Sequence, residues 1–179
     1  KKIDILESMM KNGLLVPYDI DEFSIVKTIS SMERFSSKFL LLTIAPTLDC
    51  NMACPYCYEN KKKEYMTQKV ADDIITFIEK YIDQYKIESI VITWYGGEPL
   101  LNPEIIKYLS HRIINLCDKN HIQYRASIIT NGVLLNSNIV KLLSDLKITH
   151  AQITIDGTRE TNNKRRILKD GCDSFEIIT

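Results

Sequence analysis

Cysteine is the residue type whose spacing is most informative in this chain. Cys50, Cys54 and Cys57 form a C-x3-C-x2-C pattern directly after the apolar stretch 39–45. A [4Fe-4S] cluster takes one protein ligand per iron, so three thiolates on one short loop can hold three irons and leave the fourth iron open to a small molecule. An open iron indicates chemistry rather than a purely structural site.

A structural zinc site is the main alternative, because such sites use similar cysteine spacings. Zinc needs a fourth ligand, and the remaining candidates lie far downstream without a second paired motif: Cys117, Cys172, His111, His121 and His150. The cysteines alone favour iron–sulfur over zinc and leave both open. Disulfides are less favoured, since the cysteine count of five is odd and the composition is typical of a reducing compartment, so we expect a cytoplasmic protein.

A second motif, ITWYGGEPLL at residues 92–101, ends a predicted strand with two glycines, an acid and a proline. Gly96 and Gly97 allow the backbone to approach a ligand without an intervening Cβ. The carboxylate of Glu98 can accept charge-assisted hydrogen bonds from a ligand ammonium group, and Pro99 stops the strand from continuing its ladder. The alternative is a tight strand-to-helix turn that binds nothing.

Hydrophobic periodicity predicts that these motifs sit on alternating strands and amphipathic helices. The expected strands are 39–45, 89–95, 123–130 and 151–155, and the expected helices are 67–85, 103–117 with Asn102 as N-cap, 137–146 and a last one that begins at 174. This alternation indicates parallel βα units and a helix-covered sheet. Every motif comes at or just after a strand end, so we expect the motifs to converge on one face of the sheet.

Composition excludes some function classes. The 179 residues contain 23 basic and 23 acidic side chains, which leave no electrostatic footprint for nucleic acid. The longest apolar runs are far too short to cross a membrane. The chain is long enough for one substantial domain with a real core.

Taken in order, the motifs resemble those of the radical S-adenosylmethionine enzymes, most closely the branch that modifies peptides and proteins and carries a cysteine-rich C-terminal extension. The resemblance covers residues 41–175. It rests on the cysteine loop with Tyr56 before its last cysteine, on Gly96-Gly-Glu-Pro99, on Thr130-Asn-Gly132, and on Ile153-Thr-Ile-Asp-Gly157 followed by Lys164-Arg-Arg166. It implies an α/β fold in which about four of the six βα units of a partial TIM-like barrel are present, so the radical SAM core at 39–179 is expected to be truncated at its C-terminal side.

The resemblance also implies roles for individual residues. Cys50, Cys54 and Cys57 ligate the cluster, whose open iron takes the amino and carboxylate groups of S-adenosylmethionine. Gly96, Gly97 and Glu98 meet the methionine ammonium, Thr154 lies near the cofactor, Arg166 reaches the cofactor carboxylate, and Tyr56 packs near the adenine. Reductive cleavage then yields a 5'-deoxyadenosyl radical that abstracts a substrate hydrogen. Beyond the cluster loop no catalytic residue is assigned.

Several of these roles have a plainer alternative. Thr154 fits an ordinary strand residue, and Arg166 with Lys164 and Arg165 fits a solvated loop. Tyr56 and Tyr58 fit simple packing of the loop. Cys117 lies on the apolar stripe of its helix and is expected to be a buried core thiol, whereas Cys172 stays unassigned.

The function implied by the resemblance is a peptide maturase with a peptide or protein substrate and an electron donor such as ferredoxin or flavodoxin, without nucleic acid or membrane partners. An anaerobic sulfatase-maturating enzyme is the runner-up. A non-catalytic iron–sulfur or zinc binding module is the rival from another class. Residues 1–38 are expected to form a helical preamble, which either helps to hold a leader peptide or plugs the bottom of the barrel.

Overall fold

The computed structural model describes residues 2–34, 38–60 and 62–179. The chain divides into two compact units, Lys1–Ser36 and Ser37–Thr179. The first unit holds helix α1 (Lys2–Lys11) and helix α2 (Glu22–Arg34). The Asp21 carboxylate accepts hydrogen bonds from the backbone N–H and the hydroxyl of Ser24 at the start of α2. Two helices were expected here; residues 1 and 35–37 of the expected preamble lie outside the described residues, and its role stays a prediction.

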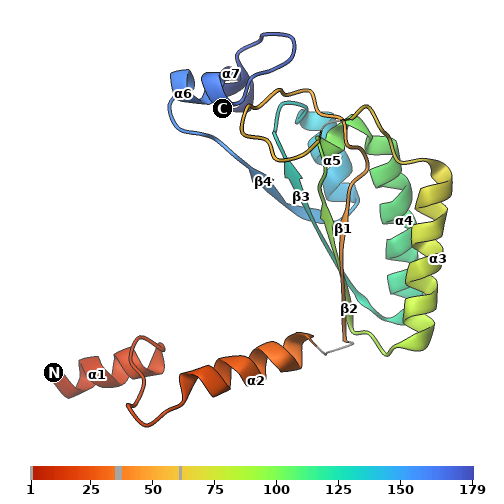
Figure 1. Cartoon of the computed structure of the whole chain (residues 1–179). Helices are drawn as coiled ribbons and strands as arrows, with labels where there is room; N and C mark the ends of the chain where they lie inside the picture. The colour runs from red at the N-terminus through yellow and green to blue at the C-terminus, as the bar shows by residue number, and fades with distance from the viewer. Residues whose placement is uncertain (1, 35–37, 61) are drawn as a thin grey trace. The chain divides into compact units, whose positions relative to one another are not determined.

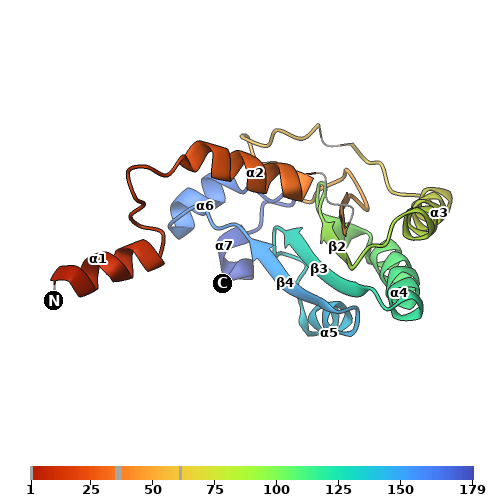
Figure 2. The same cartoon turned by 90° about the horizontal axis from the view of Figure 1, so that it is seen from below.

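The second unit is a parallel four-stranded sheet in which sequence order equals spatial order. Its strands are β1 (Phe39–Ile44), β2 (Ser89–Trp94), β3 (Gln123–Thr130) and β4 (Ile148–Ile153), and its main helices are α3 (Gln68–Gln84), α4 (Pro103–Asn120) and α5 (Ser137–Asp145). These three helices lie on one side of the sheet (Figures 1 and 2). The expected α/β arrangement of parallel βα units is therefore confirmed.

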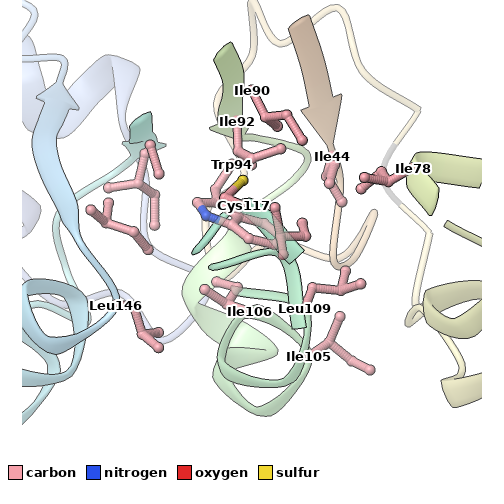
Figure 3. Close-up of a cluster of buried hydrophobic side chains, with 14 of the residues drawn as sticks. Ile44, Ile78, Ile90, Ile92, Trp94, Ile105, Ile106, Leu109, Cys117 and Leu146 are labelled. Atoms are coloured by element: carbon pink, nitrogen blue, oxygen red, sulfur yellow. The ribbon is translucent and has the colours of Figure 1, made fainter. Parts of the chain in front are cut away.

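The core lies between the sheet and the layer formed by helices α3, α4 and α5. Alternate residues of β2, namely Ile90, Ile92 and Trp94, are fully buried and pack toward this helix layer (Figure 3). Cys117 belongs to the same cluster, and burial raises the pKa of its thiol to about 11, so the prediction of a core cysteine is confirmed. Within the described residues, no helix is long and apolar enough to cross a membrane.

One local prediction was wrong in its bounds, one was right in position only, and one short helix was not predicted. Strand β4 begins at Ile148, directly after Lys147 with its positive φ of 56°, so residues 154 and 155 lie beyond its end. Asn102 occupies the N-cap position of α4 without capping it, because its amide donates a 3.0 Å hydrogen bond to the Pro46 carbonyl instead. Lys164 and Arg165, for which a solvated loop was the alternative, belong to the short helix α6 (Arg159–Arg165), which the sequence did not predict.

The chain beyond β1 continues alongside the chain beyond β2. The Gly97 N–H donates to the Thr47 carbonyl at 3.1 Å, and the Glu98 N–H donates to the Asp49 carbonyl at 2.8 Å. The two backbones are so close that a Cβ on Gly97 would lie 2.1 Å from the Asp49 carbonyl oxygen. Glycine at this position therefore permits the contact that positions the cysteine loop.

We expect Gly97→Ala to lower the free energy of unfolding by about 3 kcal/mol, because backbone must move to admit the new methyl group. Gly171→Ala is the matched control, since a Cβ there meets nothing within 4 Å and only the φ of 79° opposes it; it should cost about 1 kcal/mol. Urea unfolding followed by circular dichroism measures both. Equal losses in the two variants would show that close packing at Gly97 is not the constraint.

Candidate functional site

A cavity of about 300 Å³ opens at the carboxyl ends of the strands, where the loops after all four strands meet. These loops lie at the top of Figure 1. Every predicted site residue except Glu98 lines the cavity: Cys50, Cys54, Tyr56, Cys57, Gly96, Gly97, Thr154 and Arg166. The convergence expected from strand ends is thus realised in one site.

The three cysteines share the cavity but differ in exposure. Cys50 is buried, Cys54 is half-buried and Cys57 is exposed, and no disulfide joins any of the five cysteines, all of which are described. Among the described residues, no three histidine, cysteine or carboxylate side chains are gathered closely enough to hold a metal ion. The fourth zinc ligands considered above, including Cys117 and the three histidines, are not among the residues that line the cavity.

The cysteine loop is held by a segment more than a hundred residues downstream. The Ala53 N–H donates to the Ile167 carbonyl at 2.7 Å, and the Lys169 N–H donates to the Asn51 carbonyl at 3.0 Å. Met52 and Leu168 pair between these two bonds as an isolated antiparallel bridge. No pattern in the sequence indicated this pairing, which ties the cysteine loop to the segment that follows Arg166.

Glu98 lies in the interior with no exposed surface, at the end of β2. One carboxylate oxygen accepts hydrogen bonds from the Leu100 N–H at 3.0 Å and from the Thr130 hydroxyl at 2.7 Å. The other accepts the Asn131 N–H at 2.8 Å. The side chain therefore connects the ends of β2 and β3, and it is not among the residues that line the cavity.

Burial raises the pKa of Glu98, and the Asn131, Thr130 and Leu100 hydrogen bonds and the charge of Arg166 oppose this rise. The carboxylate thus accepts three internal hydrogen bonds, and its predicted contact with a ligand ammonium group stays a prediction.

Arg166 is buried at 9% exposure, although a solvated loop had been the alternative for this residue. Its Nη1 donates to the Tyr56 hydroxyl at 3.1 Å, while its buried Nε has no hydrogen-bond partner. An unpartnered guanidinium N–H on a cavity wall fits an anionic ligand such as a carboxylate. Together with three thiols on one loop, this donor set fits an iron–sulfur cluster and a small molecule with a carboxylate.

Tyr56 is held on more than one side. The Arg165 guanidinium lies over its ring, 5.1 Å from the centroid, and Arg165 also pairs with Asp156 at 3.3 Å. Burial and then Asp156 raise the pKa of the Tyr56 hydroxyl, while Arg166 lowers it. Thr154 lies one residue beyond β4 and is exposed, so it is not the ordinary strand residue of the alternative interpretation.

Several residues of the cavity had been given no role from the sequence. Tyr58 of the cysteine loop and Tyr95 at the end of β2 share a hydrogen bond between their hydroxyl groups, which raises the pKa of Tyr95. Asn131 and Asp156 line the cavity as well. Asn131 and Asp156 could have been predicted from the sequence, because both are polar residues just beyond a strand end and both belong to motifs described above.

We expect Glu98→Gln to lower the free energy of unfolding by about 1–3 kcal/mol, because the amide places a donor against the N–H of Asn131 or Leu100. Since the pKa of Glu98 is raised on folding from its ordinary 4.5, its protonated form contributes stability that is present below that pH and lost as the pH rises through the raised pKa. The Gln variant lacks this dependence.

Urea unfolding between pH 4 and 7 measures this pH dependence. The free energy of unfolding of the native chain, relative to that of Glu98→Gln, should decrease as the pH rises. Glu88→Gln, at an exposed carboxylate paired with Lys38, is the control for loss of one charge. Parallel pH profiles of the native chain and Glu98→Gln would contradict the raised pKa.

Comparison with known proteins gives the same picture as the geometry. The family model described as "Radical SAM superfamily" matches residues 44–178. Among curated proteins, the Fe-coproporphyrin III synthase of Methanosarcina barkeri is 30% identical over 72% of this chain and 30% of its own length. The serine-type anaerobic sulfatase-maturating enzyme of Bacteroides thetaiotaomicron is 30% identical over 70% of this chain and 31% of its own length.

Among solved structures, native anSMEcpe with bound AdoMet and Cp18Cys peptide superposes with a TM-score of 0.65 at 26% identity, over 78% of this chain and 37% of that one. The chain thus spans less than half the length of the curated relatives it matches. The expected α/β fold, built of parallel units from a partial TIM-like barrel, is confirmed by this likeness. Because the family model covers three quarters of the chain and includes the cavity loops, the protein belongs to the radical SAM superfamily.

Proposed function

We propose that the chain is the S-adenosylmethionine-cleaving core of an enzyme that modifies a peptide or protein. One observation carries the proposal. The three cysteines of one loop, the glycine turn after β2 and a buried arginine with an unpartnered N–H all line a single cavity. A binding module used only for recognition has no need of the glycine turn or the arginine beside its metal ligands.

We propose a role for each of these residues, and their positions around the cavity support it. When bound, a reduced [4Fe-4S] cluster supplies the electron that cleaves S-adenosylmethionine to a 5'-deoxyadenosyl radical. Cys50, Cys54 and Cys57 supply the thiolates for three irons. Gly96 and Gly97 present backbone to the methionine ammonium group, and Arg166 donates to the methionine carboxylate.

Tyr56 and Thr154 complete the cofactor wall of the cavity. The hydroxyl of Tyr56 is held by Arg166 and its ring by Arg165, so the aromatic side chain is kept in place beside the cysteine loop. In the proposed complex it packs near the adenine, and the exposed Thr154 hydroxyl is available to the polar part of the cofactor. The protein's own contribution is to orient the cofactor and to shield it from water.

A peptide or protein substrate is the part of the proposal that goes furthest. Relatives named as a sulfatase-maturating enzyme and as mycofactocin maturases support it, as does the peptide bound to anSMEcpe. The relative named Fe-coproporphyrin III synthase shows that the superfamily match alone does not select this substrate class. Sulfatase maturation is the second candidate, favoured by the 30% identity to the Bacteroides enzyme.

The proposed organisation assigns residues 39–179 to the radical SAM core and residues 1–38 to a separate helical preamble. The family match at 44–178 falls within the first of these. A low-potential donor such as ferredoxin or flavodoxin is the proposed source of the electron, in a cytoplasmic setting where the cysteines remain reduced.

The deciding experiment is anaerobic reconstitution of the chain with iron and sulfide, followed by reduction with dithionite in the presence of S-adenosylmethionine. We expect about four irons per chain, broad absorbance of an iron–sulfur cluster, and 5'-deoxyadenosine by chromatography. Cys54→Ala should lose most of the iron and all of the product, because a second iron, besides the open one, then has no protein ligand.

Cys172→Ala is the matched control, since this cysteine is exposed but outside the cavity, and it should retain both iron and product. Stoichiometric zinc without iron in the native chain would favour the binding module. A cluster that forms without cleavage of S-adenosylmethionine would contradict the enzymatic proposal while leaving the cysteine assignment in place.

A further inference from the structure

Asn131, the first residue after β3, is buried at 6% exposure and has a fixed orientation. Its amide oxygen accepts a hydrogen bond from the Val133 N–H at 3.0 Å. Because the oxygen is thereby identified, the amide nitrogen must point the other way. There it lies 2.7 Å from the Asn51 side-chain oxygen and 3.8 Å from the Cys50 sulfur.

The two hydrogens of this amide nitrogen thus have two acceptors, one oxygen and one sulfur. The Cys50 sulfur receives a second donor, the Met52 N–H, at 3.4 Å. Cys50 is also the most buried of the three loop cysteines. Its sulfur therefore sits in a low-dielectric environment with N–H dipoles directed at it, where each dipole has a larger electrostatic effect than in water.

We propose that Asn131 sets the reduction potential of the cluster through its N–H contact with the sulfur of Cys50, an inference that rests on the proposed cluster. Reduction adds one negative charge, which is shared with the thiolate sulfurs. An N–H donor stabilises that extra charge more than the oxidised state, so it shifts the potential to less negative values. Asn131 is a positioning residue that acts through Cys50.

The position of Asn131 is determined by its neighbours. Its backbone N–H donates to Glu98, and the hydroxyl of Thr130 accepts the Gly132 N–H at 3.1 Å. The Glu98 carboxylate binds Thr130 and Asn131 together at the end of β3. The donor to sulfur is therefore held by the same interior carboxylate that connects the strands, and the Thr-Asn-Gly motif gains a role that its spacing did not show.

The test is a dye-mediated redox titration of the reconstituted chain, monitored by electron paramagnetic resonance of the reduced cluster. Asn131→Leu removes the donor at similar volume, and Asn131→Asp replaces it with an oxygen. Both should shift the midpoint potential to more negative values, the Asp variant more strongly because it adds negative charge near Cys50. Asn162→Leu is the matched control, since Asn162 is also fully buried but bonds to Asp156 and Ser174 rather than to the cysteine loop.

The native chain separates the two proposals. Absence of an iron–sulfur cluster there would overturn the proposed function and this inference with it. A cluster with the same potential in Asn131→Leu and in the native chain would overturn the inference alone. An equal shift in Asn162→Leu would assign the effect to general loosening, and loss of the cluster from both Asn131 variants would show that Asn131 holds the loop rather than tunes the cluster.

Discussion

The hydrogen bonds accepted by the buried Glu98 carboxylate are the interaction on which the site depends. Backbone groups at strand and helix ends have no partner within their own element. Here the Asn131 N–H just after β3, the Leu100 N–H at the start of the short helix Pro99–Leu101 and the Thr130 hydroxyl converge on a single interior side chain. Leaving a carboxylate buried without these donors would be costly, and leaving the donors without an acceptor would add a further, smaller cost. The ends of β2 and β3 are therefore linked, and the loops that follow them start from defined positions.

Two contacts beside this link hold the cysteine loop in position. On one side, the close backbone contact at Gly97 holds the chain that leads into Cys50 against the end of β2. On the other, Asn131 bonds to Asn51 and approaches the Cys50 sulfur. The first cysteine is consequently buried and oriented, while Cys57 near the far end of the loop remains exposed. The difference in exposure between the two cysteines suits a site that is fixed on one side and accessible to a small molecule on the other.

The second wall of the cavity uses charge and aromatic packing instead of backbone contact. Arg165 and Arg166 follow one another in the chain, yet one stacks over Tyr56 and the other binds its hydroxyl. Asp156 forms an ion pair with Arg165. The buried Nε of Arg166, by contrast, has no hydrogen-bond partner. A buried guanidinium with one N–H left without a hydrogen bond destabilises the fold, and an anionic ligand that accepts this hydrogen bond would offset the destabilisation.

The sequence by itself determined the alternation of strands and helices, the convergence of the motifs on one face and eight of the residues that line the cavity, because periodicity and strand ends are local properties. It placed the start of β4 three residues and its end two residues too late, and it missed α6, since neither segment has a strong apolar period and both depend on contacts with distant chain. Only the tertiary structure decided that Glu98 faces the interior, that Asn131 reaches Cys50 and that segment 167–169 pairs with the cysteine loop. These outcomes depend on which buried donors and acceptors meet across the fold, and that matching is a property of three-dimensional proximity rather than of spacing along the chain.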